Sequence, residues 1–173
     1  MTRYGFKEIT ANNWLEPDRV LKGFVRILPD GRSSPVTGEE YLDCILKPRL
    51  LEPVPIDVQA LFEVTRGAMV YGYFFYPLYT LAAQQLFRVA EAAVLHKCKA
   101  LGAPQSKRTF KKRIHWLVDE ETIPKSELGR WEALRGLRNA ASHPDSQSII
   151  APGNAIGLLE RITEQINSLF AGE

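Results

Sequence analysis

Cysteine is scarce in this sequence, and histidine almost equally so. Among 173 residues there are two cysteines, Cys44 and Cys98, in unrelated contexts, so we expect reduced thiols and no disulfide. His96 and Cys98 lie two residues apart and would face different sides of a helix, and no second pair completes a zinc set. His115 has no convincing partner either. We therefore expect no metal site.

A strong excess of either charge is also missing. The formal net charge is +2, which excludes a whole-surface attraction to nucleic acid and leaves local clusters to bind anions. No cationic segment followed by a short apolar run opens the sequence, so the cytoplasm is the expected compartment. Residues 67–87 carry no formal charge, but Pro77 and four tyrosines make them a poor match to lipid. We expect a buried helix-turn-helix junction there, and no membrane contact.

Phosphate-binding loops of the Walker type and dinucleotide fingerprints are absent, which disfavours an NTPase or a Rossmann enzyme. The serines near His143 lack the strand-turn-helix context of a hydrolase nucleophile. We expect no cofactor.

The first 56 residues differ in composition from the rest. They contain six of the eleven prolines, and the turn signal Pro29-Asp30-Gly31 follows a short strand-like run at 23–28. Pro53 and Pro55 indicate a stiff connector, because each disfavours helix in the residue before it. We predict an irregular, lightly β N-terminal extension over residues 1–56, which could cover the helices, extend a dimer interface or recognise a partner.

Residues 57–173 repeat apolar positions at spacings of three and four, the pattern of amphipathic helices. The predicted helices are one capped by Asp57, one from Pro77 to Gly102, one capped by Thr109, one from about Ser126 to Pro144, and one from about Pro152. Four or five such helices on short loops predict an all-α antiparallel bundle.

The stretch from Leu134 to Pro144 carries the residues with chemistry. On a helix, Asn139 and His143 share one face, and Arg138 and Ser142 share the neighbouring one. His143 precedes a proline, so it should project past the helix end, where its imidazole can transfer protons near neutral pH. The Arg138 guanidinium is shaped for phosphate oxygens. Arginine, histidine and an amide suffice to cleave RNA without a metal, because the 2′-hydroxyl of the substrate is the nucleophile.

The run Arg138-Asn139-Ala140-Ala141-Ser142-His143 resembles the signature of the HEPN superfamily: an arginine, a polar residue, a short spacer and a histidine late in a four-to-five-helix bundle. The resemblance covers roughly residues 56–170. It implies a homodimer with facing motifs, acting as a metal-independent endoribonuclease in toxin-antitoxin or antiviral defence, with a possible antitoxin or other protein partner. It also implies that Arg138 contacts the scissile phosphate, His143 handles the proton and Asn139 orients the site.

Two other functions stay open: a non-catalytic HEPN-like module that binds RNA, a nucleotide or a protein, and a plain helical interaction domain.

The number of groups that can carry a proton favours a dimeric enzyme, independently of the family resemblance. Transesterification needs a base and an acid, yet one chain offers one histidine in a plausible site, His143. Two chains would supply two.

A basic cluster supports an RNA path. Five cations occur within seven residues around Phe110, Arg135 precedes the motif by three residues, and Ser142 lies within it. The expected substrate contacts are Lys107, Arg108, Lys111, Lys112, Arg113, Arg135 and Ser142. The alternative for the cluster is a solvated helix face. The alternative for Arg138 is a structural ion pair with Glu132 or Asp145. Glu91 could also reach Arg138, although we favour a surface carboxylate there.

Overall fold

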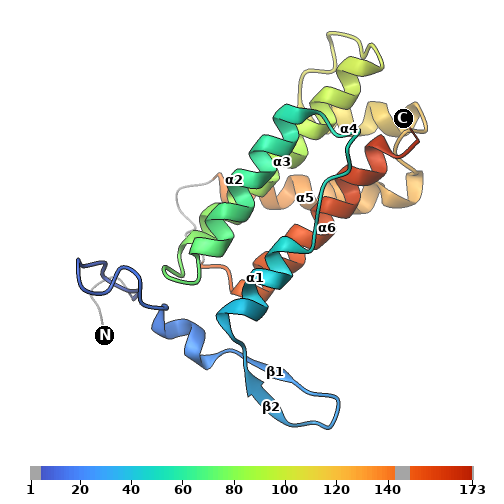
Figure 1. Ribbon diagram of the computed structural model, residues 1–173. Coiled ribbons are helices and arrows are strands. Elements are labelled where there is room, and N and C mark those ends of the chain that lie inside the picture. The colour runs from blue at the N-terminus through green and yellow to red at the C-terminus, as the bar shows by residue number, and fades with distance from the viewer. Residues whose placement is uncertain (1–4, 143–148, 173) are drawn as a thin grey trace.

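The structure, a computed structural model, describes residues 5–142 and 149–172 (Figure 1). These residues form six α-helices, two short 3₁₀ helices and one two-stranded sheet. In chain order the elements are η1 (Arg19–Gly23), β1 (Val25–Ile27), β2 (Ser33–Pro35), α1 (Gly38–Leu46), α2 (Ile56–Tyr71), α3 (Leu78–Ala100), α4 (Phe110–Asp119), η2 (Lys125–Glu127), α5 (Leu128–Ala141) and α6 (Pro152–Phe170). The prediction of a helical fold is confirmed.

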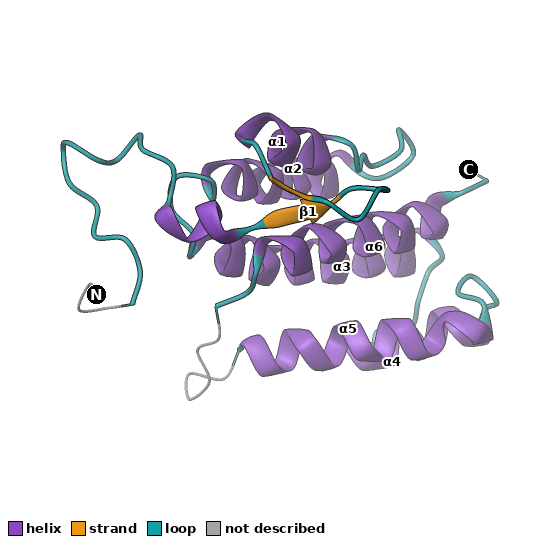
Figure 2. Ribbon diagram, turned by 90° about the horizontal axis from the view of Figure 1, so that it is seen from below, coloured by secondary structure: helices purple, strands orange, loops and turns teal. Residues whose placement is uncertain are grey.

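Helix α3 lies at the centre of the helices. Figure 2 shows α3 and α6 side by side in a middle layer, with α1 and α2 on one side and α4 and α5 on the other. Because α3 packs against α2, α4, α5 and α6, most of its length is buried. Its buried alanines, Ala82, Ala83, Ala90 and Ala93, leave room for these neighbours to approach.

The N-terminal extension contains the predicted strand and turn, and also a helix that the prediction missed. Strands β1 and β2 pair antiparallel, with Val25 opposite Pro35, and Gly31 has the positive φ (81°) that the turn requires. Helix α1 follows at once. It begins with a capping box, in which Thr37 Oγ1 accepts from Glu40 N and Glu40 Oε2 accepts from Thr37 N. The extension is therefore more regular than its prolines suggest.

Helix α1 belongs to the same hydrophobic core as the later helices. Tyr41 and Ile45 are buried in that core. Arg66 of α2, 8% exposed, donates through Nε and Nη2 to the carbonyls of Ile45 and Leu46, at 3.2 and 3.0 Å. These bonds satisfy carbonyl groups that the end of α1 leaves unpaired.

The uncharged stretch at 67–87 is a helix-turn-helix junction, as predicted: α2 ends at Tyr71 and α3 begins at Leu78. Asp18 is buried and connects the N-terminal extension to this junction, because its carboxylate accepts a hydrogen bond from Tyr76 N at 2.9 Å. Of its tyrosines, Tyr71 is exposed, whereas the Tyr79 hydroxyl is buried without a partner among the described residues, and burial raises the Tyr79 pKa. No helix in the described ranges is both long and apolar enough to cross a membrane.

Most predicted helix boundaries are confirmed, with two differences. Gly102, at φ 73°, follows the end of α3; Thr109 caps α4 by accepting from Lys112 N; and Pro152 is the first residue of α6. Asp57 is not the cap of α2, because the helix already begins at Ile56. The residues from 125 first form η2, so α5 begins at Leu128, slightly later than expected, and it ends at Ala141.

Candidate functional site

Arg138 lies at the edge of the buried face of α5. Trp131 and Leu134 anchor this helix in the core, 1% and 4% exposed, and Arg138 follows Leu134 by four residues on the same face. Its Nη2 lies 3.0 Å from Oε2 of Glu91 on α3, while 39% of the arginine side chain stays exposed. The expectation that Glu91 is a plain surface carboxylate is therefore wrong. Glu91 therefore pairs with the guanidinium of a side chain that is partly exposed.

The residues after Arg138 finish the helix. Asn139 is exposed, and its Oδ1 lies 3.5 Å from Arg138 Nη1, longer than the usual length of about 2.7–3.2 Å for an N–H···O hydrogen bond, so the contact is weak. Ser142 is the C-cap of α5, and its hydroxyl donates to the carbonyl of Arg138 at 3.0 Å. His143, Pro144 and Asp145 lie outside the described residues. The structure thus positions Arg138, Asn139 and Ser142 of the predicted site, and says nothing of His143.

A second charged group on α5 was missed by sequence reasoning. His115 of α4 contacts Glu132 through Nε2 and Oε1 at 2.8 Å, and Arg135 Nε donates to Glu132 Oε2 at 2.7 Å. The hydrogen bond from Arg135 is the largest influence that lowers the Glu132 pKa. The expectation that His115 has no convincing partner is wrong. Arg135, expected to contact substrate, is 28% exposed and pairs with Glu132.

The two charged groups follow one another along α5. Glu132, Arg135 and Arg138 are spaced three residues apart, so about 9 Å of helix rise separates Glu132 from Arg138. Partners come from α4 at one end, through His115, and from α3 at the other, through Glu91. The result is a partly exposed row that contains a guanidinium, whose fork has the shape to bind phosphate oxygens, and an imidazole oriented by a carboxylate.

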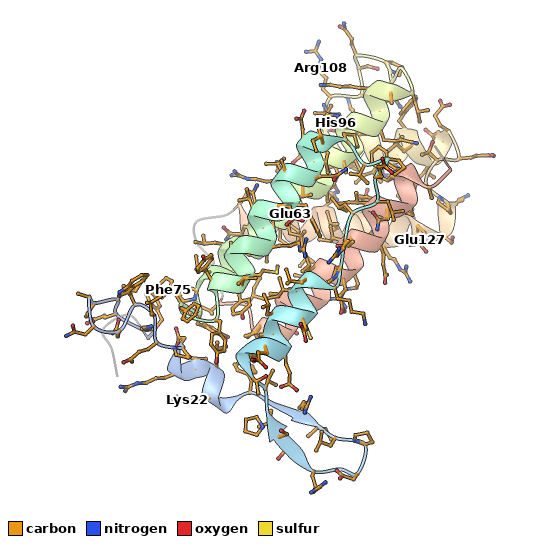
Figure 3. The ribbon with its side chains drawn as sticks, in the orientation of Figure 1. Lys22, Glu63, Phe75, His96, Arg108 and Glu127 are labelled. Carbon is orange, nitrogen blue, oxygen red and sulfur yellow. The ribbon has the colours of Figure 1, made fainter. Side chains whose placement is uncertain are left out.

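The basic cluster divides into two parts. Lys107, Arg108 and Arg113 line a pocket of about 280 Å³ between the C-terminal part of α3 and the loop that leads into α4. Lys111 and Lys112 are exposed and do not line it. Figure 3 shows Arg108 at the end of the molecule where α3 gives way to α4, opposite to Lys22 of the extension.

Neither the family models, nor the curated proteins, nor the solved structures contain a match to this chain. Within residues 5–142 and 149–172, no three His, Cys, Asp or Glu side chains gather into a group that could hold a metal ion. The features of the molecule that bear on its function are therefore the charged row of α5 and the cations near α4.

Proposed function

We propose that the protein is a metal-independent endoribonuclease of HEPN type that acts as a homodimer, in toxin-antitoxin or antiviral defence and with an antitoxin or other protein as a further partner. One observation supports this most directly: Arg138, in the last turn of α5, is fixed by Glu91 and yet keeps 39% of its side chain exposed. A partly exposed arginine side chain whose guanidinium is held by one carboxylate suits a transition state in which charge grows on phosphate oxygens.

In the proposed reaction the 2′-hydroxyl of the RNA attacks the adjacent phosphorus, and the bond to the 5′-oxygen breaks. A base takes the proton of the 2′-hydroxyl and an acid protonates the departing 5′-oxygen. Arg138 offsets the charge on the non-bridging oxygens, and Asn139, exposed beside it, orients the RNA. His143 is the first proton carrier, as the resemblance implies.

The second proton carrier has two possible sources. One is His143 of a second copy, which requires the dimer. The other is His115 of the same chain, 44% exposed and oriented by Glu132. In the second case Glu132 is a positioning residue, since it holds the imidazole and does not touch the RNA.

The exposed cations near α4 support a path for the RNA strand. Leu95, in the wall of the basic pocket, lies four residues beyond Glu91 on α3, so about 6 Å of helix rise separates these two residues, and Lys99 of the pocket rim lies about 12 Å from Glu91. Residues four apart share a helix face, so one strand could contact both. Lys111 and Lys112 extend the positive surface.

The proposal is tested by incubating single-stranded RNA with the protein in EDTA and analysing the products. We expect fragments that end in a 2′,3′-cyclic phosphate, and loss of cleavage in Arg138→Ala and His143→Ala. Arg130→Ala, an exposed arginine on the same helix, is the matched control and should cleave normally. RNA that stays intact with the wild-type protein refutes the catalytic proposal.

The second proton carrier is identified by two further measurements. If His143 of a second copy supplies it, a mixed dimer of one wild-type and one His143→Ala chain, formed under confirmed subunit exchange, holds a single His143 and is inactive. If His115 supplies it, that mixed dimer keeps one complete site and stays active, and His115→Ala and Glu132→Gln lower kcat and shift the pH profile of cleavage.

The pairing of Arg138 with Glu91 favours one alternative function. A carboxylate 3.0 Å from the guanidinium cancels part of its charge, which weakens its stabilisation of a transition state and leaves only a weaker contact with a bound anion. A non-catalytic HEPN-like module would bind RNA, a nucleotide or a protein and leave RNA intact. Tight RNA binding without cleavage in the same assay selects this alternative.

A further inference from the structure

The basic pocket beside α3 and α4 combines two kinds of surface. Its apolar wall comes from Leu95, Ala103 and Pro104, together with the thiol of Cys98. Its rim carries four cations and one amide side chain: Lys99, Lys107, Arg108, Arg113 and Gln105. Among the described residues that line it there is no Asp or Glu. A ligand that fits this pocket therefore has an anionic end and an apolar or aromatic face.

The four cations have no acidic partners in the part of the chain that the structure describes. None forms an ion pair there with a carboxylate; Arg108 instead donates Nε to the carbonyl of Gln105 at 3.1 Å. Four like charges around one hollow repel each other, and an anion between them relieves that repulsion.

Helix α4 adds to the same positive potential. It begins at Phe110, directly after Lys107 and Arg108, so the positive end of its dipole lies beside these side chains. Cations at a helix N-terminus weaken the helix, so helix stability does not account for them. Lys99 differs, because a cation in the last turn of α3 stabilises that helix.

Cys98 contributes to the wall as a neutral group. Its side chain is 2% exposed, and burial raises the pKa of the thiol to about 11. At neutral pH it is therefore an apolar part of the pocket, neither a nucleophile nor a charge. The pocket volume of about 280 Å³ is close to the lower end of the range for small-molecule sites, about 300–1,000 Å³, which suits a single nucleotide unit.

We propose that this pocket binds a nucleoside 5′-monophosphate unit at the 5′ end of an RNA strand. The phosphate lies among the cations, because two guanidinium forks and two ammonium groups match a doubly charged phosphate. The first base lies against Leu95, Ala103 and Pro104. This inference rests on the proposed action on RNA and adds a substrate class, strands with a 5′-monophosphate, whose next nucleotides run along α3 toward Arg138.

The test is binding of two short RNA strands that differ at the 5′ end alone, one with a phosphate and one with a hydroxyl. Both are 2′-O-methylated throughout, so that they lack the nucleophile and binding is measured without cleavage. Fluorescence anisotropy of a 3′ label should show about tenfold or more tighter binding of the phosphorylated strand. Arg113→Gln should abolish this preference, so that the variant binds the two strands with affinities that agree within about twofold.

Lys112→Gln is the matched control, because Lys112 is on the same helix, carries the same charge and lies outside the pocket. Lys112→Gln should weaken binding of both strands equally and keep the preference for the phosphorylated strand. Lys107→Gln is a second pocket variant, needed because Arg113 lies within α4, where a substitution can change the helix itself, whereas Lys107 lies before it. Circular dichroism identifies a variant that fails to fold.

Three outcomes would overturn the inference: equal affinity for the two strands, a preference lost equally in Lys112→Gln, or a preference retained in both pocket variants. Adenosine 5′-monophosphate, with adenosine as control, separates the sources of the phosphate. If the monophosphate binds while the phosphorylated strand has no advantage, the pocket takes a free nucleotide and the assignment to a strand end is wrong. A phosphate preference without cleavage would refute the proposed catalysis and leave the pocket assignment standing.

Discussion

Replacing Glu91 by Gln is expected to tighten RNA binding while leaving the fold almost unchanged. The substitution removes the negative charge next to Arg138 but keeps an oxygen that can accept from Nη2, now 3.0 Å from Oε2. It therefore separates the charge of Glu91 from its role in holding the guanidinium. If Arg138 contacts phosphate, the carboxylate competes with the RNA.

The expected cost in stability is small. The two side chains are 26% and 39% exposed, so the ion pair is screened by water. Pairs of this kind contribute about 0.2–1 kcal/mol in double-mutant cycles. Because Gln keeps the hydrogen bond, the free energy of unfolding should fall by less than about 1 kcal/mol.

The expected gain in RNA affinity follows from Coulomb's law. A phosphate on the open edge of the guanidinium lies about 7 Å from the Glu91 carboxylate, and that repulsion is about 0.6 kcal/mol in water and about 2.4 kcal/mol near a protein surface. Removing it should tighten binding by a factor of about 3 to 50. The lower figure applies if the site is well hydrated.

Fluorescence anisotropy of a labelled RNA and urea denaturation measure the two quantities. Glu127→Gln is the matched control, since Glu127 pairs with Arg130 at 3.1 Å on an exposed part of the molecule and the change in net charge is the same. The reasoning is refuted if Glu91→Gln binds RNA no more tightly than Glu127→Gln. A loss of stability above about 2 kcal/mol would show that the pair is structural.

Three further predictions concern the scaffold of the site. Trp131→Ala should lower the free energy of unfolding by about 3–5 kcal/mol, because the side chain is 1% exposed, and Leu137→Ala, at 48% exposure, by far less; equal losses in urea denaturation would contradict this. Thr109→Ala should cost about 1 kcal/mol in the same assay through loss of the α4 cap, and Thr109→Ser should restore it. The hydrogen bond from Arg135 lowers the Glu132 pKa, so folding favours the ionised carboxylate. The resulting stabilisation of the folded state is present above the ordinary carboxyl pKa of 4.5, and it is lost as pH falls through the lower pKa of the folded state. Stability measured below about pH 4.5 should therefore depend less on pH in Glu132→Gln, and an identical pH dependence would oppose the assignment.

The parts of the fold that were predicted correctly are those with local signals. Thr109, Gly102 and Pro152 act through their own backbone neighbours, so their helix boundaries follow from the sequence. The missed helix α1 also had a local signal, the Thr37 and Glu40 capping box, which the proline content of the region obscured. Asp57 was read as a cap because of its residue type, which would make Val58 the first helical residue, whereas the helix begins two residues earlier, at Ile56, with Pro55 as its N-cap.

The candidate site was predicted less completely, because its contacts join distant segments. Glu132 and Arg135 are three apart on one helix, and such a pair can be inferred from spacing. The contact of His115 with Glu132 depends on how α4 packs against α5, and that of Arg138 with Glu91 on how α5 crosses α3. No periodicity in the sequence specifies these packing arrangements.

An arginine in the last turn of a helix needs no substrate to explain it, because a cation there stabilises the helix by about 0.3–1 kcal/mol. Its pairing with Glu91 adds little to stability at the observed exposure. The pair does restrict the conformations of the Arg138 side chain. An unrestrained arginine side chain has about 2 kcal/mol of conformational entropy to lose. In Arg138 part of this entropy is lost on folding, so less of it is lost when RNA binds. Glu91→Ala should therefore bind RNA less tightly than Glu91→Gln, although both lack the charge, and equal affinity of the two variants would mean that Glu91 does not preorganise Arg138.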